Sequence, residues 1–271
     1  MIRKCFTVNA MRRPDEIKSY EEHLIKTNIF KGCEIFYPYN VSKEQYDNYV
    51  EGIKSYLKYD DFEITCHLPH GKDNNIASEE NIENVMNRMY DAIDFASMFK
   101  VKGLTLHPGH SENNEDRQVC FMRSVNNVKK IANYAKKYNM IIMIENLVGS
   151  HELCLTSEEM LEYLSNFKGE NVLMTFDCGH CHAAHSENKT PVVEFVRSLN
   201  KNIAHIHLSD NHGEKDEHQK LGSGTIDFVS YFKELKNINY SGLYSSEVLF
   251  NSYEDLINTS NAIDNFMKEV E

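Results

Sequence analysis

Six short apolar runs along the chain end in side chains that can bind a metal ion. These side chains belong to His67, His107, Glu145, Asp177, His207 and Glu247. One polar residue at the end of a buried run is commonly a hydrogen-bonded core residue. Six such residues in succession are harder to explain as core residues, because burying uncompensated ionisable groups costs several kcal/mol each. The pattern therefore predicts a site in which a bound cation holds these residues together.

Two further segments add donors of the same kinds. His180 follows Asp177 by three residues, and Asp216 and His218 stand two residues apart in a polar segment. Imidazole and carboxylate donors suit Zn²⁺ or Mn²⁺, and iron or cobalt is also possible. We therefore expect a divalent metal cofactor, zinc or manganese.

The segments that must position these residues alternate between strand-like and helix-like patterns. Strands are expected at Arg3–Asn9, Cys33–Tyr37, Phe62–His67, Gly103–His107, Ile141–Glu145, Val172–Asp177, Ile203–Leu208 and Leu243–Val248. Amphipathic helices are expected at Asp15–Ile29, Lys43–Tyr59, Ser78–Phe99, Asp116–Tyr138, Ser157–Phe167, Pro191–Leu199, Ile226–Leu235 and Tyr253–Val270. Eight strand–helix pairs in strict alternation predict a parallel α/β sheet, and the chain length matches a (β/α)8 TIM barrel.

A doubly wound open sheet is the competing α/β fold. Its dinucleotide-binding form carries a glycine-rich turn after the first strand, whereas residues 9–14 (NAMRRP) contain no glycine. We therefore expect a single TIM barrel domain over residues 1–271. In such a barrel the catalytic groups lie at the C-terminal ends of the strands, where the six predicted ligands stand.

Three local patterns give finer expectations. Ser78 and Thr156 (or Ser157) precede pairs of glutamates and are typical of helix starts. The glycine-rich segment 221–225 (LGSGT) precedes a helix and could present backbone N–H groups to a phosphate. His205 shares a strand face with His207 but lies one layer deeper, so we expect it to form a hydrogen bond in the core.

The composition limits the class of protein. The net charge is −12, which argues against a broad polyanion-binding surface. Seven cysteines at irregular spacing suggest reduced thiols. The N-terminus leads directly into a strand-like run without an apolar leader, and no apolar stretch is long enough for a membrane helix. We therefore expect a cytoplasmic protein that does not bind membranes.

Several motifs together resemble those of the xylose isomerase-like barrel superfamily. They are His67-Leu68-Pro69-His70, Leu106-His107-Pro108-Gly109, Ile144-Glu145-Asn146, Phe176-Asp177-Cys178-Gly179-His180, Ile206-His207-Leu208-Ser209-Asp210-Asn211, residues 216–227 (DEHQKLGSGTID), and the strand around Glu247. The superfamily includes sugar isomerases and epimerases and the endonuclease IV group of abasic-site nucleases. The resemblance covers nearly the whole chain and implies the TIM barrel.

The sugar epimerases of this superfamily imply one set of roles. One divalent ion would be held by a quartet consisting of Glu145, Asp177, His207 and Glu247. The two glutamates would remove and return a proton next to a carbonyl, through an enediolate. The substrate would be a small carbohydrate or its phosphate, contacted by His180, His70 and Asn146.

The endonuclease IV group implies a second set of roles, in which three zinc ions catalyse phosphodiester hydrolysis and nucleic acid is the partner. His67 and His107 would join Glu145 at one ion, and the quartet would hold the second. His180, Asp216 and His218 would hold the third.

For each set of roles, this sequence departs from the pattern of the corresponding family. The segment from Asn211 to Leu221 lacks the arginine that epimerases often place after the seventh strand. The segment after the second strand, residues 38–43, is short and carries one lysine, and His70 stands where the nucleases have a tyrosine. We expect the isomerase or epimerase first and keep the nuclease as the alternative. By resemblance, a homo-oligomer is expected.

Overall fold

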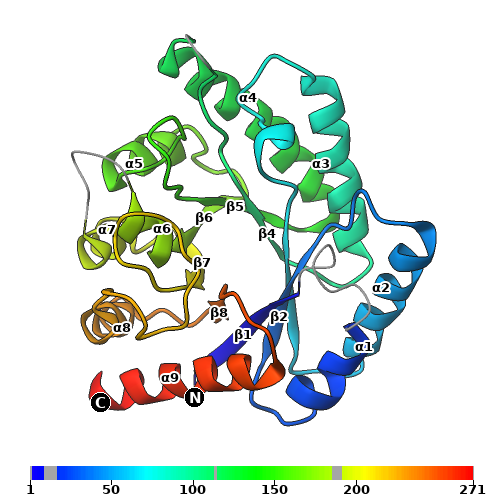
Figure 1. Ribbon diagram of the computed structural model, residues 1–271. Coiled ribbons are helices and arrows are strands. Elements are labelled where there is room, and N and C mark those ends of the chain that lie inside the picture. Colours follow the sequence, from blue (N-terminus) through cyan, green and yellow to red (C-terminus); the bar gives the residue numbers. More distant parts are fainter. Residues whose placement is uncertain (1, 9–16, 113–114, 185–190, 271) are drawn as a thin grey trace.

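Eight parallel strands close into a barrel at the centre of the molecule (Figure 1). This computed structural model describes residues 2–8, 17–112, 115–184 and 191–270. The strands are β1 (Arg3–Val8), β2 (Gly32–Phe36), β3 (Glu63–His67), β4 (Gly103–Leu106), β5 (Ile141–Glu145), β6 (Val172–Asp177), β7 (Ile203–Leu208) and β8 (Leu243–Ser246). They pair in chain order, and β8 pairs with β1 to complete the closure. The predicted TIM barrel is confirmed.

Helices surround this barrel and connect its strands (Figure 1). The α-helices are α1 (Ile17–Tyr20), α2 (Lys43–Tyr56), α3 (Ile82–Ser97), α4 (Arg117–Ala135), α5 (Ser157–Ser165), α6 (Cys178–Ala183), α7 (Val192–Leu199), α8 (Phe228–Asn237) and α9 (Tyr253–Val270). Shorter turns are the π-helix η2 (Glu21–Ile25) and the 3₁₀ helices η3 (Lys72–Asn74) and η4 (Lys136–Tyr138). No described helix is long and apolar enough to cross a membrane.

The main apolar core lies between the sheet and the helices. Alternate strand residues such as Ile35, Ile144 and Ile206 are fully buried members of one cluster, which also includes Phe195 and Tyr231 of the helices. Because strand side chains alternate between the two faces, the residues between these point into the barrel. The sequence pattern of each strand thus separates an apolar outer face from the inner face.

The part of the barrel interior below the C-terminal mouth is polar. Thr105 of β4 donates to Glu34 of β2 and pairs with Thr175 of β6, at 2.9 Å and 3.1 Å. These strands are not neighbours in the closed sheet, so the contacts cross the barrel interior. TIM barrel interiors are usually filled by branched apolar residues. Here, side chains with hydrogen-bonding groups underlie the C-terminal mouth.

Helix starts differ in part from the expectations. Thr156 is the N-cap of α5 and accepts from the backbone N–H of Glu159, as predicted. Ser78 is not the cap of α3, because residues 75–81 form turns and the helix begins after Asn81. The segment after Asp177, for which no helix is expected from the sequence, forms the short helix α6, which Asp177 caps. Asn9 and residues 15–16, which belong to the first expected strand and helix, lie outside the described residues.

Candidate metal centre at the mouth of the barrel

The six predicted strand-end residues meet at the C-terminal mouth. His67, Glu145 and Asp177 are the last residues of β3, β5 and β6. His107 and Glu247 directly follow β4 and β8, and His207 is the penultimate residue of β7. A parallel barrel brings all these strand ends to one side, which explains why residues far apart in sequence converge.

The predicted quartet surrounds one imidazole nitrogen. Nδ1 of His207 lies 2.8 Å from Glu145 Oε1, 2.8 Å from Glu247 Oε2 and 3.7 Å from Asp177 Oδ2. The four donor atoms all lie within 4.8 Å of one another. Asp177 has one oxygen free for this cluster, because its Oδ1 accepts the backbone N–H of His180 at the start of α6.

Two further groups flank the quartet. Glu145 Oε2 lies 3.2 Å from His67 Nε2 and 2.9 Å from His107 Nε2, so Glu145 belongs to both groups. On the other flank, Asp216 Oδ2 lies 2.7 Å from His218 Nε2 and 3.5 Å from His180 Nε2. The structure therefore gathers all nine predicted ligands into three adjoining groups.

Most of these imidazoles are held through their second ring nitrogen. Nδ1 of His67, His180 and His218 donates to the carbonyl oxygens of Leu68, Asn146 and Glu247, at 2.8, 2.9 and 2.8 Å. His207 differs, because its Nε2 lies 2.7 Å from the carboxylate of Glu34. A metal-binding histidine is usually oriented in this way by a hydrogen bond on its other nitrogen.

The comparisons with known proteins agree with the fold. A profile of the family described as xylose isomerase-like TIM barrel matches residues 24–265. The chain belongs to this family. The resemblance found in the sequence is thereby confirmed.

Proteins with related sequences include an uncharacterized protein of Methanocaldococcus jannaschii. It is 30% identical over 68% of this chain, and the match spans 64% of that protein, just under two thirds of its length. A ketose 3-epimerase of Arthrobacter globiformis is 24% identical over 48% of this chain and 41% of its own. The crystal structure of a D-tagatose 3-epimerase-like protein is 26% identical, with a TM-score of 0.80, and covers 98% of this chain and 97% of its own.

Among the described residues, only imidazoles lie close enough to the carboxylates at the mouth of the barrel to balance their negative charge. Burial lowers the pKa of His207, but the carboxylates of Glu34, Glu247 and Glu145 outweigh burial and raise it well above its ordinary value. Burial likewise opposes a charge on His218, yet the Asp216 carboxylate raises the pKa of His218 to about 9. Without a metal, protons on buried imidazoles must therefore neutralise the carboxylates.

Asp177 shows that this balance is incomplete. Burial raises the pKa of Asp177 to about 6, and the neighbouring His180 offsets burial only in part. Its Oδ2 is buried without a hydrogen bond, as are Asp216 Oδ1 and Glu247 Oε2. Such atoms cost free energy unless something binds them. Since Nδ1 of His207 carries at most one proton for three carboxylates, a divalent cation fits this donor set.

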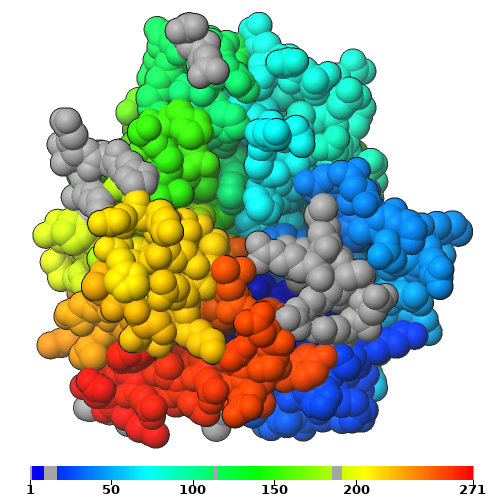
Figure 2. All heavy atoms as spheres, in the orientation of Figure 1, coloured from blue at the N-terminus to red at the C-terminus, as the bar shows by residue number. Residues whose placement is uncertain are grey.

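A cavity of about 540 Å³ adjoins the three groups of predicted metal ligands. Its lining residues are Thr7, Tyr20, Phe36, His70, His218, Glu247, Val248, Leu249, Phe250 and Asn251. The space-filling view shows a hollow beside the orange segment that follows β8 (Figure 2). Two potential ligands thus face a space of the size that a small substrate needs, beside an apolar wall.

The three residues expected to contact substrate differ in their surroundings. His70 lines this cavity, and its ring centre lies 4.7 Å from that of His67 and 4.8 Å from that of His107. His180 is buried among the predicted metal ligands. Asn146 is fully buried, and its amide pairs with the backbone N–H and carbonyl of Asp177, both at 2.9 Å. Asn146 therefore positions the end of β6, and its contact with substrate stays a prediction.

The expectation for the glycine-rich segment is wrong. The backbone N–H groups of Gly222 and Gly224 donate to Asp210 Oδ2, at 2.9 and 2.8 Å, and that of Ile226 donates to Oδ1. An internal carboxylate therefore occupies the place that a phosphate would need. Asp210 is fully buried, and its carboxylate stabilises the turn through these three N–H groups.

The deeper histidine also differs from its expectation. His205 is buried as expected, but its Nε2 has no hydrogen-bond partner among the described residues and lies 3.8 Å from Glu34 Oε1. Burial lowers the pKa of His205 to about 4, despite the nearby carboxylate of Glu34. Glu34 itself was missed by the sequence reasoning. Its only signal was an acidic residue in the middle of a strand expected to be buried on both faces.

Proposed function

We propose that this chain is a divalent-metal-dependent isomerase or epimerase of a small ketose. The observation that carries the proposal is the quartet, in which Glu145 and Glu247 approach the same nitrogen of His207 beside an open cavity. The likeness to a D-tagatose 3-epimerase-like protein and to a ketose 3-epimerase supports the same class of substrate.

The quartet would hold the ion, and Glu247 would exchange the proton with substrate. When bound, the ion would polarise the substrate carbonyl and stabilise the negative charge that develops on its oxygen. Glu247 lines the cavity and its side chain is 19% exposed. Burial raises the pKa of Glu247, but His207 and His218 outweigh burial and lower it, so the carboxylate is ionised and can accept a proton.

Glu145 would act from the opposite side of the reacting carbon. Its side chain is fully buried, and its two oxygens face different imidazoles, His207 on one side and His67 and His107 on the other. Removal of the proton by one glutamate and its return by the other would invert the carbon or shift the carbonyl. The greater burial of Glu145 makes Glu247 the residue that meets incoming substrate.

The occupied glycine-rich turn favours a free sugar over a sugar phosphate. Its N–H groups already bind Asp210, so this segment offers no phosphate site. The cavity beside Glu247 has a wall of Phe36, Val248 and Phe250, which suits the carbon backbone of a sugar better than a dianion.

Solvent-deuterium exchange tests the proposal directly. Metal-loaded protein in D₂O should introduce deuterium at the carbon next to the carbonyl of at least one ketose, read by NMR. Glu247→Gln should slow this exchange about 100- to 10,000-fold, the usual contribution of a general base. Glu63→Gln, an acid at the other end of the barrel, is the matched control and should not change it. Lack of exchange across a panel of ketoses and their phosphates would remove the proposal.

Phosphodiester hydrolysis is the second candidate, because the structure brings together three ligand groups and the quartet needs only one. Glu145 connects the first two groups, and His180, Asp216 and His218 form the third beside them. Closely spaced ions can activate a water and neutralise a phosphodiester oxygen. Incision of an abasic-site duplex by zinc-loaded protein, lost on chelation, would support this candidate, and intact duplex would reject it.

A further inference from the structure

We propose that Glu34 is a positioning residue that holds His207 so that Nδ1 faces the three carboxylates of the metal centre. The inference rests on the metal binding in the proposed function, but not on the identity of the substrate. Glu34 lies in the middle of β2, and His207 near the end of β7. These strands are separated by β8 and β1 in the closed sheet, so the two side chains meet across the barrel.

The contact is short and fully enclosed. Glu34 Oε2 lies 2.7 Å from His207 Nε2, and both residues have no exposed surface. The other oxygen, Oε1, accepts from the Thr105 hydroxyl at 2.9 Å. One side of the carboxylate is therefore fixed by Thr105, and the other side by the imidazole. These two contacts fix the orientation of the Glu34 carboxylate relative to the His207 ring.

This hydrogen bond decides which nitrogen of His207 can bind the ion. If Nε2 carries the proton that Glu34 accepts, Nδ1 of the neutral ring presents its lone pair to the quartet. The other anchored imidazoles of the centre, such as His67 and His218, donate to neutral carbonyl oxygens. A carboxylate withdraws the proton more strongly than a carbonyl, so it makes the opposite nitrogen a better donor to a metal.

The burial of Glu34 supports a role beyond folding. Among the described residues, its partners are imidazoles and a hydroxyl, and no lysine or arginine contacts it. A buried carboxylate without a cation is costly, and an amide of the same size would avoid that cost. The charge of Glu34 becomes favourable once the ring beside it is bound to a cation.

A competing use of Glu34 is direct metal binding. Glu34, His205 and His207 also lie within ligating distance of one another. An ion there would need Nε2 of His207 while Nδ1 serves the quartet, so the ring would have to lose both of its protons. The quartet offers three carboxylates to Nδ1, whereas Nε2 meets only one. The geometry therefore favours a hydrogen bond at Nε2.

Zinc affinity and stoichiometry test the inference. Wild type, Glu34→Gln and the matched control Thr105→Val would be stripped of metal and titrated with zinc against a chelating dye. Glu34→Gln should weaken zinc binding about 10- to 100-fold with the number of ions unchanged. Thr105→Val removes the hydrogen bond at Oε1 and the contact with Thr175 but leaves the Glu34–His207 contact in place, and should change affinity by less than about threefold.

A second measurement needs no variant and stands even if Glu34→Gln does not fold. Wild type labelled with ¹⁵N-histidine and loaded with zinc should show a slowly exchanging His207 proton on Nε2, while Nδ1 shows the shift of a metal-bound nitrogen. A proton on Nδ1 with zinc on Nε2 would overturn the inference.

The remaining outcomes separate this inference from the proposed function. Equal zinc affinity in Glu34→Gln and wild type would overturn the positioning role. Loss of one whole ion in both Glu34→Gln and His205→Gln would overturn it too, because Glu34 would then be a ligand. Zinc binding that depends on Glu34, without deuterium exchange into any ketose, would refute the proposed function and leave the positioning role intact. Absence of zinc binding in wild type would refute both.

Discussion

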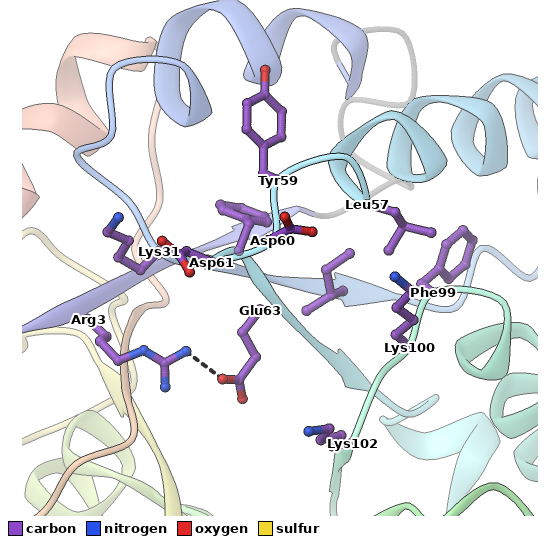
Figure 3. Close-up of a pocket in the computed structure, with 12 residues that line it drawn as sticks. Arg3, Lys31, Leu57, Tyr59, Asp60, Asp61, Glu63, Phe99, Lys100 and Lys102 are labelled. Atoms are coloured by element: carbon purple, nitrogen blue, oxygen red, sulfur yellow. Dashed lines mark hydrogen bonds and ion pairs between the residues drawn. The ribbon is translucent and has the colours of Figure 1, made fainter.

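The two ends of the barrel carry acidic residues in opposite ways. At the N-terminal end, a cavity of about 550 Å³ is lined by acids and bases together, and Figure 3 shows the ion pair between two of its lining residues, Arg3 and Glu63. Their ion pair of 2.6 Å involves side chains that are 40% and 41% exposed. At the mouth, Glu145 and Asp177 are fully buried, and their described partners include no lysine or arginine.

This difference distinguishes a solvated ion pair from a candidate metal centre. Water and mobile lysines can balance the acids around Glu63, so their arrangement says little about ligands. At the mouth, Glu145 and Asp177 are fully buried, and the acids share too few protons, as the unpaired Oδ2 of Asp177 shows. Because an uncompensated buried charge is costly, the carboxylates then require protons on imidazoles or bound cations. The two cavities are of similar size, and the one at the mouth is therefore the better candidate site because of the residues beside it.

The proposed difference between the two ends of the barrel would be refuted most clearly if a buried acid at the mouth could be replaced without effect. Asp177→Asn keeps the size of the side chain and should lower zinc affinity and deuterium exchange about 1,000-fold, because a ligand and its charge are lost. The metal-free variant should be at least as stable as wild type at pH 7, since burial raises the pKa of Asp177 to about 6. Zinc titration, exchange rates and thermal unfolding measure these effects. Unchanged zinc binding would show that Asp177 is not a ligand.

The stability of the metal-free protein should depend on pH in the range where the imidazoles lose protons. The folded-state pKa of His218 is raised to about 9, above its ordinary 6.5. Its contribution is therefore fully present below pH 6.5 and is lost as the pH rises through 9. The expected loss is on the order of 2–3 kcal/mol for this residue.

Thermal unfolding between pH 6 and pH 9.5 measures this loss. Zinc should remove much of the pH dependence by replacing the protons, and should release protons when it binds. A metal-free protein whose melting temperature stays flat over this range would contradict the charge balance proposed for the mouth.

His107→Gln separates the two candidate functions within the mouth. His107 contacts Glu145 but does not belong to the quartet. If the quartet alone serves an epimerase, deuterium exchange should fall less than tenfold. If three ions act together, the variant should lose one ion and most of its hydrolytic activity. Metal analysis and both activity assays on the same preparation decide between these results.

The smallest effect is expected at the N-terminal end. Glu63→Gln removes the ion pair with Arg3, which is exposed to solvent on both sides. Such pairs contribute about 0.2–1 kcal/mol, so the melting temperature should change little and zinc binding should not change. Chemical denaturation and zinc titration check both statements. An altered metal affinity would mean that the two ends of the barrel are coupled.

The sequence was informative wherever a regular element determines position. The short apolar runs and their strict alternation with amphipathic helices predicted the barrel, and parallel strands place residues such as His67 and Glu145 at one end. The donor types then predicted a metal centre. This reasoning needed no knowledge of loop conformation, because each of these residues lies in a strand or directly after one.

The errors concern residues whose partners are distant or irregularly placed. Glu34 is isolated between Cys33 and Ile35, and its partners lie 71 and 173 residues away, so no local pattern marks it. The turn at Gly222 was interpreted as a phosphate site because the sequence does not show that the Asp210 carboxylate already fills it. Both cases depend on tertiary contacts that local patterns do not encode.

The number and identity of metal ions per chain test the central claim most directly. Protein purified without chelator would be analysed by mass spectrometry for metals, and the ions located by anomalous diffraction. We predict at least one ion, zinc or manganese, among Glu145, Asp177, His207 and Glu247, and its loss in Asp177→Asn. Protein that binds no divalent ion at micromolar concentration, or binds it only away from the mouth, would contradict the account.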